Sequence, residues 1–410
     1  MPRWASPAFE RMAPARPRSL ALDVFRGATV ALMILVNNPG SWAHLYPPLA
    51  HAPWHGCTAT DLVFPFFLFA VGNALALVMP RLLAATPAGF GASVARRALL
   101  IFGLGLLLNA FPFVRWDAAG ELVPRDWSRL RVLGVLQRIA IAWALAAVLV
   151  RCLRGRPRPV LGGAAALLLA YWGLCVALGT PGDPYSLEGF FGTPLDRALL
   201  GPAHLYQGEG VPFDPEGLAS TLPAVAQVLL GWWAGEHLRD GGSGPRQLVR
   251  WFIAATLLLA LAQVWQLAMP LNKKIWTSPY VLHTTALAML AMGVLLPALD
   301  RPAGAPAGRW WAGGARALAR FCEVFGKNPL FIFVLSGLVP RALALLRWPD
   351  AAGAPGAPAF TSPLPWLYQA WFAGIGTDPR LGSLLFALAN LAGYWALARW
   401  LDRRGIYFRV

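Results

Sequence analysis

The chain has 410 residues, of which 57% are hydrophobic and only 13% are charged. Because soluble globular domains carry roughly 25% charged residues, this composition excludes an ordinary soluble enzyme, and it also excludes a disordered or fibrous chain. A mean hydropathy of +0.52 and apolar runs of about 17 to 23 residues indicate one polytopic membrane domain. The net charge of +16 does not indicate nucleic-acid binding, because the basic residues lie in short clusters between apolar runs, in the pattern of the positive-inside rule.

Ten apolar segments are long enough to cross a bilayer, and each must be helical because lipid offers the backbone no hydrogen-bond partner. These segments begin near Leu20, Asp61, Val94, Val132, Val160, Leu218, Leu248, Pro279, Phe321 and Ser383. The stretch from Pro363 to Ile375 is short for a span, and it predicts an interfacial helix, a re-entrant helix or an eleventh span. The predicted fold class is therefore all-α, a polytopic membrane protein with ten or eleven transmembrane helices.

Basic residues are unequally divided between the two sides of the predicted membrane. With a cytoplasmic N-terminus and alternating spans, 22 Lys and Arg side chains fall on the N-terminal side and 10 on the opposite side. Both termini are therefore expected in the cytoplasm, with residues 1–18 as a tail and residues 19–410 as a single transmembrane domain. Asp23 and Arg26 within the first apolar run argue against a cleavable signal peptide. The excess of Arg over Lys favours a bacterial source, and so the inner membrane.

The first outer loop, residues 38–60, has no Lys or Arg but contains half of the six histidines, namely His44, His51 and His55. Imidazole can take and return a proton at neutral pH, which makes histidine the usual general base. The loop is therefore a candidate catalytic centre. The alternative is a set of interfacial histidines beside two tryptophans.

A metal site is a second interpretation of the same loop. His51 and His55 have the i, i+4 spacing that places two imidazoles on one helical face, and Asp61 is near in sequence. Pro53 and Gly56 weaken a helix there, so we expect no metal. The four cysteines are scattered and indicate neither a disulfide framework nor a metal site.

Polar residues border the histidine loop on both sides. Asn37 and Asn38 end the first span, where a side-chain amide could donate to a developing oxyanion or could simply cap the helix end. Asp61 opens the second span, where it would serve equally as a helix N-cap.

Five charged residues lie inside predicted spans, where each must be paired or face a polar cavity. Asp23 with Arg26, and Glu323 with Lys327, have the spacing for ion pairs within their own helices. Arg138 has no carboxylate at such a spacing, so it more strongly indicates a partner from another helix or an anionic ligand.

The stretch Gly326-Lys327-Asn328-Pro329 interrupts the ninth predicted span. It predicts a broken helix whose second half presents its positive N-terminal end to phosphate or another anion. A proline kink that needs no ligand is the alternative.

A long outer loop, residues 180–217, carries six carboxylates, opposed by Arg197. A loop of this kind could act as a lid over a polar or cationic acceptor, or it could be an ordinary solvated loop.

Several ordered motifs resemble a known family, the bacterial relatives of heparan-alpha-glucosaminide N-acetyltransferase among the transmembrane acyltransferases. The motifs are SLALDVFRGATVALMILVNNPG (19–40), HAPWHGCTATDLVFPFFLFAVG (51–72), RVLGVLQRIA (131–140), FDPEGLASTLPA (213–224), PLNKKIWTSPYVL (270–282) and GKNPLFIF (326–333). Together they extend the resemblance over nearly the whole chain.

The resemblance implies transfer of an acetyl group from cytosolic acetyl-CoA, across the membrane, to a sugar amine on the far side. It places the histidine of the family's HAxW motif on His51 and the helix-end asparagine on Asn37. His55 stands where the animal enzyme has a different polar residue, so we assign it no catalytic role. The loop between Asn37 and His51 is also longer than in the animal enzyme.

We therefore predict an acetyl-CoA-dependent N- or O-acetyltransferase of a sugar or glycoconjugate, with His51 as base and Asn37 on the thioester carbonyl. Direct transfer needs fewer assumptions than an acyl-histidine or acyl-Cys57 intermediate. The residues expected to bind the CoA phosphates or to line its channel are Arg26, Arg138, Lys327 and Asn328.

The expected partners are acetyl-CoA, the acceptor and the lipid bilayer, without nucleic acid, and a homo-oligomer is compatible with the sequence. A transporter of a small anionic solute is the main alternative, because broken helices and intramembrane charges occur in transporters too. A non-catalytic membrane scaffold is a third interpretation.

Overall fold

The computed structural model describes residues 19–117, 119–241, 244–300, 314–349 and 360–408. The predicted tail, residues 1–18, lies outside the described residues.

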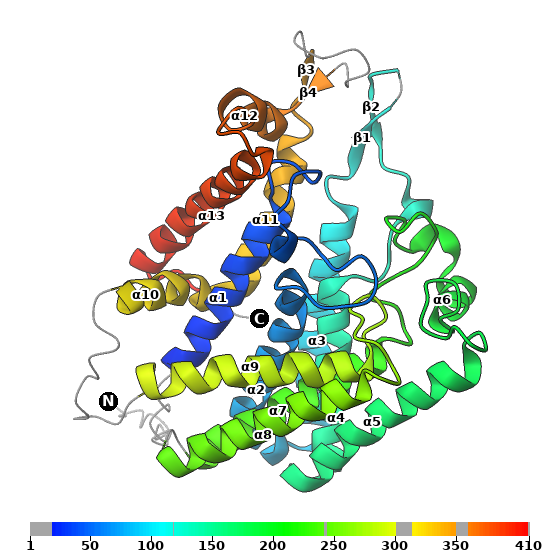
Figure 1. Ribbon diagram of the computed structural model, residues 1–410, viewed down its shortest axis with the longest axis vertical. Helices are drawn as coiled ribbons and strands as arrows, with labels where there is room; N and C mark the ends of the chain where they lie inside the picture. The colour runs from blue at the N-terminus through cyan, green and yellow to red at the C-terminus, as the bar shows by residue number, and fades with distance from the viewer. Residues whose placement is uncertain (1–18, 118, 242–243, 301–313, 350–359, 409–410) are drawn as a thin grey trace, which may run out of the picture.

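The described chain is mostly helical (Figure 1). Its α helices, in chain order, are α1 (Leu20–Asn37), α2 (Val63–Ala84), α3 (Pro87–Ala110), α4 (Val135–Cys152), α5 (Pro157–Leu178), α6 (Gly192–Leu200), α7 (Thr221–Gly241), α8 (Pro245–Trp265), α9 (Ser278–Leu299), α10 (Gly314–Lys327), α11 (Pro329–Leu343), α12 (Pro363–Trp371) and α13 (Pro379–Arg403). Short 3-10 turns are η1 (Pro47–Leu49), η2 (Thr60–Leu62), η3 (Trp127–Arg129) and η4 (Pro202–His204).

Two small antiparallel hairpins lie in the loops at one end of the molecule (Figure 1). They pair β1 (Val114–Trp116) with β2 (Leu122–Pro124), and β3 (Trp348–Pro349) with β4 (Phe360–Thr361). The all-α fold class predicted from the apolar runs is confirmed, since these strands are only two or three residues long.

All ten predicted segments are helical. Fewer than ten of the described helices, however, are both long enough and apolar enough to count as membrane spans. In the described ranges, eight helices are long and apolar enough to cross a membrane, or up to nine if α10 and α11 form one bent span. Helix α7 is 21 residues long but more polar, because it is packed inside the protein. There Gln227 donates to the hydroxyls of Thr284 and Thr285 of α9, so α7 needs no apolar surface for lipid.

The stretch from Pro363 forms α12, a helix of nine residues. At 1.5 Å per residue it is about 14 Å long, too short for a hydrocarbon core of about 30 Å. The segment is therefore not an eleventh span.

The predicted break in the ninth span is confirmed. Helices α10 and α11 meet at an angle of 80°, with Asn328 between them and Pro329 in the first turn of α11. Proline fits this first turn because its missing N–H would have no partner there. The break turns α11 across the molecule while α10 stays beside α1 (Figure 1).

Helices α1 and α10 approach closely through two glycines. A methyl group added at Gly27 would collide with the carbonyl of Cys322, and one added at Gly326 would collide with the carbonyl of Asp23. Small residues allow backbones to come this near, which is the usual device for packing helices within lipid. Through this crossing, α1 connects the group formed by α10, α11 and α13 to α2 and α9.

Replacing Gly27 by alanine should destabilise the protein by about 1–3 kcal/mol, the usual cost of forcing extra atoms into a packed interior. The matched control is Gly103→Ala in α3, where an added methyl group meets no atom within 4 Å and gains up to about 1 kcal/mol of helix propensity. Thermal unfolding in detergent measures both. Equal melting temperatures for the two variants would contradict the close crossing.

Candidate active site

His51 is held by a buried carboxylate at the outer end of α2. Its Nδ1 lies 2.6 Å from Oδ1 of Asp61, whose side chain is only 1% exposed, whereas the imidazole is 44% exposed. Because a carboxylate only accepts hydrogen bonds, Nδ1 carries the ring proton and donates it to Asp61. Nε2 of the neutral ring is then the atom with a free lone pair.

The second oxygen of Asp61 organises the loop itself. It accepts hydrogen bonds from the backbone N–H groups of Ala52 (3.1 Å) and Thr58 (3.0 Å), and from the Thr58 hydroxyl (3.0 Å). These donors precede Asp61 in the chain, so its carboxylate fixes the histidine loop instead of capping the first turn of α2, for which no side-chain cap is present. Asp61 thus defines where His51 points.

Lys273 approaches the same imidazole from the loop between α8 and α9. Its Nζ lies 3.1 Å from Nδ1 and 3.4 Å from Nε2 of His51, and 3.6 Å from Oδ1 of Asp61. Burial lowers the pKa of Lys273, and the negative charges of Asp61 and Glu216 partly offset this effect. A cation and a buried carboxylate therefore meet at the exposed imidazole of His51.

Lys274 ties this lysine loop to two others. It donates to the carbonyl of Pro53 (2.8 Å) and forms an ion pair with Glu209 (2.6 Å), and its Nζ lies 5.5 Å from the ring centroid of Trp54. The histidine loop, the lysine loop and the long outer loop are thereby fixed to one another. The long loop, described above only as a candidate lid, is anchored beside His51.

The i, i+4 spacing of His51 and His55 does not produce a shared helical face, because the residues between them form no helix. His51 turns to Asp61, whereas Nδ1 of His55 lies 3.3 Å from the side-chain nitrogen of Asn272. Burial lowers the pKa of His55. Within the described part of the chain, no group of three His, Cys, Asp or Glu side chains could hold a metal ion.

The two asparagines at the end of α1 have different surroundings. The Asn38 amide donates to the carbonyl of Ile34 (2.8 Å) and so satisfies the helix end. Asn37 is exposed, and among the described residues its side chain forms no hydrogen bond, either with His51 or with any other group.

Arg138 lies under the long outer loop and is only 1% exposed. Its Nη2 donates to the carbonyl of Gly217 (3.1 Å) and to the Ser220 hydroxyl, and its guanidinium lies 5.3 Å from the ring centroid of Trp276. Its other two nitrogens have no hydrogen-bond partner among the described residues. The partners of Arg138 are thus a backbone carbonyl and a hydroxyl just before α7, and an anionic ligand of Arg138 stays a prediction.

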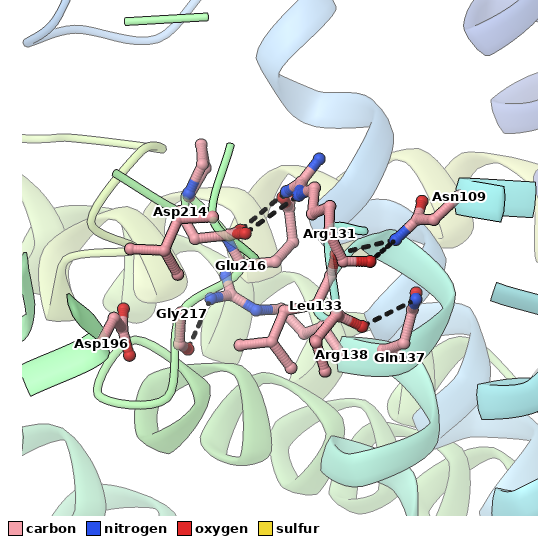
Figure 2. A network of polar contacts seen from close by, with 12 residues as sticks. Asn109, Arg131, Leu133, Gln137, Arg138, Asp196, Asp214, Glu216 and Gly217 are labelled. Atoms are coloured by element: carbon pink, nitrogen blue, oxygen red, sulfur yellow. Dashed lines mark hydrogen bonds and ion pairs between the residues drawn. The ribbon is translucent and has the colours of Figure 1, made fainter. Parts of the chain in front are cut away.

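Arg131 and Arg138 belong to one network of polar contacts, the outer network, which also includes Asp196, Asp214 and Glu216 (Figure 2). Nε and Nη2 of Arg131 bind the two carboxylate oxygens of Asp214 at 2.9 and 2.7 Å, and Nη2 also contacts Glu216. These carboxylates raise the pKa of Arg131 despite its burial. Asp196 accepts from the N–H of Leu218 (2.9 Å).

The remaining three candidates for CoA binding lie elsewhere. Arg26 pairs with Asp23 in its own helix. Lys327 pairs with Glu323 (2.9 Å) and also with Asp402 of α13 (3.1 Å).

The Asn328 side chain binds the C-terminal segment, donating to the carbonyl of Ile406 and accepting from the N–H of Phe408, both at 2.9 Å. Lys327 and Asn328 thus lie together at the helix break, apart from Arg26 and Arg138, and a shared donor site for all four stays a prediction.

Asp61 as the partner of His51, and Lys273 as its neighbour, were not identified as site residues from the sequence. Asp61 was considered only as a metal ligand or a helix cap. Lys273 stands within the motif PLNKKIWTSPYVL, and a lysine pair in an outer loop is the signal that could have drawn attention to it.

These features define a polytopic helical membrane protein with a His–Asp–Lys cluster in the loops that join its helices. A family model described as heparan-alpha-glucosaminide N-acetyltransferase, catalytic, matches residues 18–269, more than half of the chain, and the chain belongs to this family.

Two curated relatives match the chain. Heparan-alpha-glucosaminide N-acetyltransferase of Homo sapiens is 28% identical over 346 residues, which cover 72% of this chain and 50% of the human protein. The Mus musculus protein of the same name is 26% identical over 356 residues, which cover 73% of this chain and 53% of the mouse protein. The chain thus spans about half the length of the curated relatives it matches.

The outer network predicts a dependence of stability on pH. Burial raises the pKa of Asp196 from 3.8 to about 6, so its contribution to stability is complete below pH 3.8 and is lost as the pH rises through about 6. In the variant Asp196→Asn, the amide does not titrate and its oxygen can still accept from Leu218. Between pH 4 and 6 this variant should therefore gain stability relative to the wild type, by at most about 3 kcal/mol, which is seen as a growing difference in melting temperature. Above pH 7 the difference should stay constant. A difference in melting temperature between the two proteins that stays the same from pH 4 to 8 would contradict a raised pKa of Asp196.

Proposed function

We propose that this protein transfers an acetyl group from cytosolic acetyl-CoA to an amine or hydroxyl of a sugar or glycoconjugate on the extracytoplasmic side of the membrane. The observation that carries the proposal is the contact of 2.6 Å between the exposed imidazole of His51 and the buried carboxylate of Asp61. Membership of the N-acetyltransferase family supports acetyl transfer as the reaction, and the apolar helices support a membrane setting.

His51 acts as general base in this proposal. Its Nε2 takes a proton from the acceptor while the acceptor nitrogen or oxygen attacks the thioester carbonyl carbon. The carbon–sulfur bond then breaks, and the imidazolium returns the proton to the CoA sulfur. Asp61 keeps the ring in the required tautomer and stabilises the imidazolium, without itself being protonated.

Two groups are suited to stabilise the carbonyl oxygen as negative charge develops on it. The Lys273 ammonium lies 3.4 Å from Nε2 of His51, so it is within reach of a carbonyl held beside that nitrogen. The free amide of Asn37 is the second donor. Direct transfer is favoured over an acyl-Cys57 intermediate, because burial raises the pKa of the Cys57 thiol to about 12 and so suppresses the reactive thiolate.

The donor enters from the cytosolic side along α1. Arg26 and Asn37 lie in opposite halves of this helix, and the 11 residue steps from one to the other correspond to about 17 Å. CoA phosphates held near Arg26 would leave the thioester in reach of the outer loops. Arg138 lies beneath the outer loop, Lys327 pairs with Glu323 and Asp402, and Asn328 binds the C-terminal segment. In this proposal these three residues line the walls of the donor channel.

Transport of a small anionic solute is the second candidate, favoured by the 80° break between α10 and α11. Purified protein incubated with radiolabelled acetyl-CoA and glucosamine-type acceptors separates the two functions. Acetylated product would support the enzyme, whereas solute uptake into vesicles without product would support the transporter.

His51→Ala should lower transfer at least about a hundredfold while CoA binding is largely preserved, because a general base is worth roughly 10²–10⁴ in rate. Steady-state turnover and CoA binding measure the two effects. His44→Ala, which removes another imidazole of the same loop, should stay close to the wild type. Turnover of His51→Ala within a few-fold of the wild type would remove the base from the mechanism.

Asp61→Asn should lower kcat about 10- to 1,000-fold with an unchanged KM for acetyl-CoA, because the amide can hold the imidazole in the wrong tautomer. Since Asp61 acts through His51, the double variant with His51→Ala should be no slower than His51→Ala alone. Thr58→Val, which removes one hydrogen bond to the other carboxylate oxygen, is the control for loop structure. Additive losses in the double variant would show that Asp61 does not position His51.

A further inference from the structure

Arg97 of α3 is a partly buried cation that no part of the proposed mechanism uses. Its guanidinium lies 4.7 Å from the ring centroid of Trp143 of α4. Its Nε is buried without a hydrogen-bond partner, and so is the indole N–H of Trp143, a side chain only 3% exposed. The described structure pairs Arg97 with no carboxylate. Donors without acceptors in a membrane interior are costly, so their arrangement indicates a ligand that supplies acceptors.

Arg26 of α1 also has a buried nitrogen without a hydrogen-bond partner. It contacts Asp23 through one nitrogen, but its Nε is likewise buried without a partner. Arg26 and Arg97 are thus two guanidinium groups on separate helices, each with a buried Nε that has no partner among the described residues. Like charges in a medium of low dielectric constant repel strongly unless an anion lies between them.

Both arginines lie in the first half of their helices, which begin on the cytosolic side in the proposed orientation. Arg26 is six residues from the start of α1 and Arg97 is ten residues from the start of α3, which correspond to about 9 and 15 Å along helices that cross about 30 Å. His51 lies beyond the outer end of the bundle. One elongated donor can therefore contact the arginines at one end and the base at the other.

We propose that Arg97, together with Arg26, holds a phosphate group of the CoA donor, an inference that rests on the proposed function. Guanidinium groups match phosphate geometry and bind it through paired hydrogen bonds. The face of Trp143 keeps the Arg97 fork in one plane, and the indole N–H is a third donor at the same place. Arg97 is thus a binding residue that selects a phosphorylated thioester over a smaller one.

The test compares Arg97→Gln with Arg96→Gln, which removes the same charge from the exposed neighbour on the same helix. Each protein is assayed in nanodiscs with acetyl-CoA and with S-acetylpantetheine, which carries no phosphate. Arg97→Gln should raise the KM for acetyl-CoA about 10- to 100-fold, the scale of lost hydrogen bonds to a charged group, with kcat within about threefold. The KM for S-acetylpantetheine should not change, and Arg96→Gln should match the wild type. Arg97→Lys keeps the charge and replaces the glutamine variant if that variant fails to fold. Its KM for acetyl-CoA should lie between those of the wild type and Arg97→Gln.

Equal KM values for acetyl-CoA in Arg97→Gln and Arg96→Gln, with an active wild type, would overturn the inference and leave the proposed function intact. An effect of Arg97→Gln seen only in discs with anionic lipid would also overturn it, because the phosphate would then belong to a lipid headgroup. A wild type that neither binds nor uses acetyl-CoA would overturn the proposed function, and the inference with it.

Discussion

The carboxylate of Asp61, buried at the outer end of α2, is the constraint on which the candidate site depends. A charge removed from water must receive hydrogen bonds from its surroundings. Asp61 receives them from His51, Ala52 and Thr58, while its backbone carbonyl accepts from the Tyr280 hydroxyl of α9 at 2.5 Å. Satisfying one carboxylate therefore fixes the histidine loop and orients its imidazole, and the backbone carbonyl of the same residue joins this point to α9. The orientation of the His51 imidazole thus follows from the requirements of folding.

The same principle organises the rest of the outer face. Arg131 binds Asp214 and Glu216 in place of water, and Lys274 joins Glu209 to the histidine loop. The long outer loop is thereby held close to His51.

The fold could be predicted from the sequence because the length of an apolar run and the position of a proline act locally. The runs predicted the helices, and Pro329 predicted the break. The number of spans could not be predicted, since α7 is shielded from lipid by contacts between segments distant in sequence. The site shows the same division. The concentration of histidines drew attention to His51, but its contact with Lys273 joins residues 222 positions apart. Tertiary packing determines that meeting, and no local pattern encodes it.

The central claim is that an imidazole on the outer face meets a thioester delivered from the cytosol. The most direct measurement uses sealed proteoliposomes with the protein in one known orientation, acetyl-CoA only on the side of the N-terminus, and a glucosamine-type acceptor only on the side of residue 51. We predict acetylated acceptor on the side of residue 51, with all free CoA remaining on the side of the N-terminus. Product that forms only when both substrates share one compartment would contradict the account.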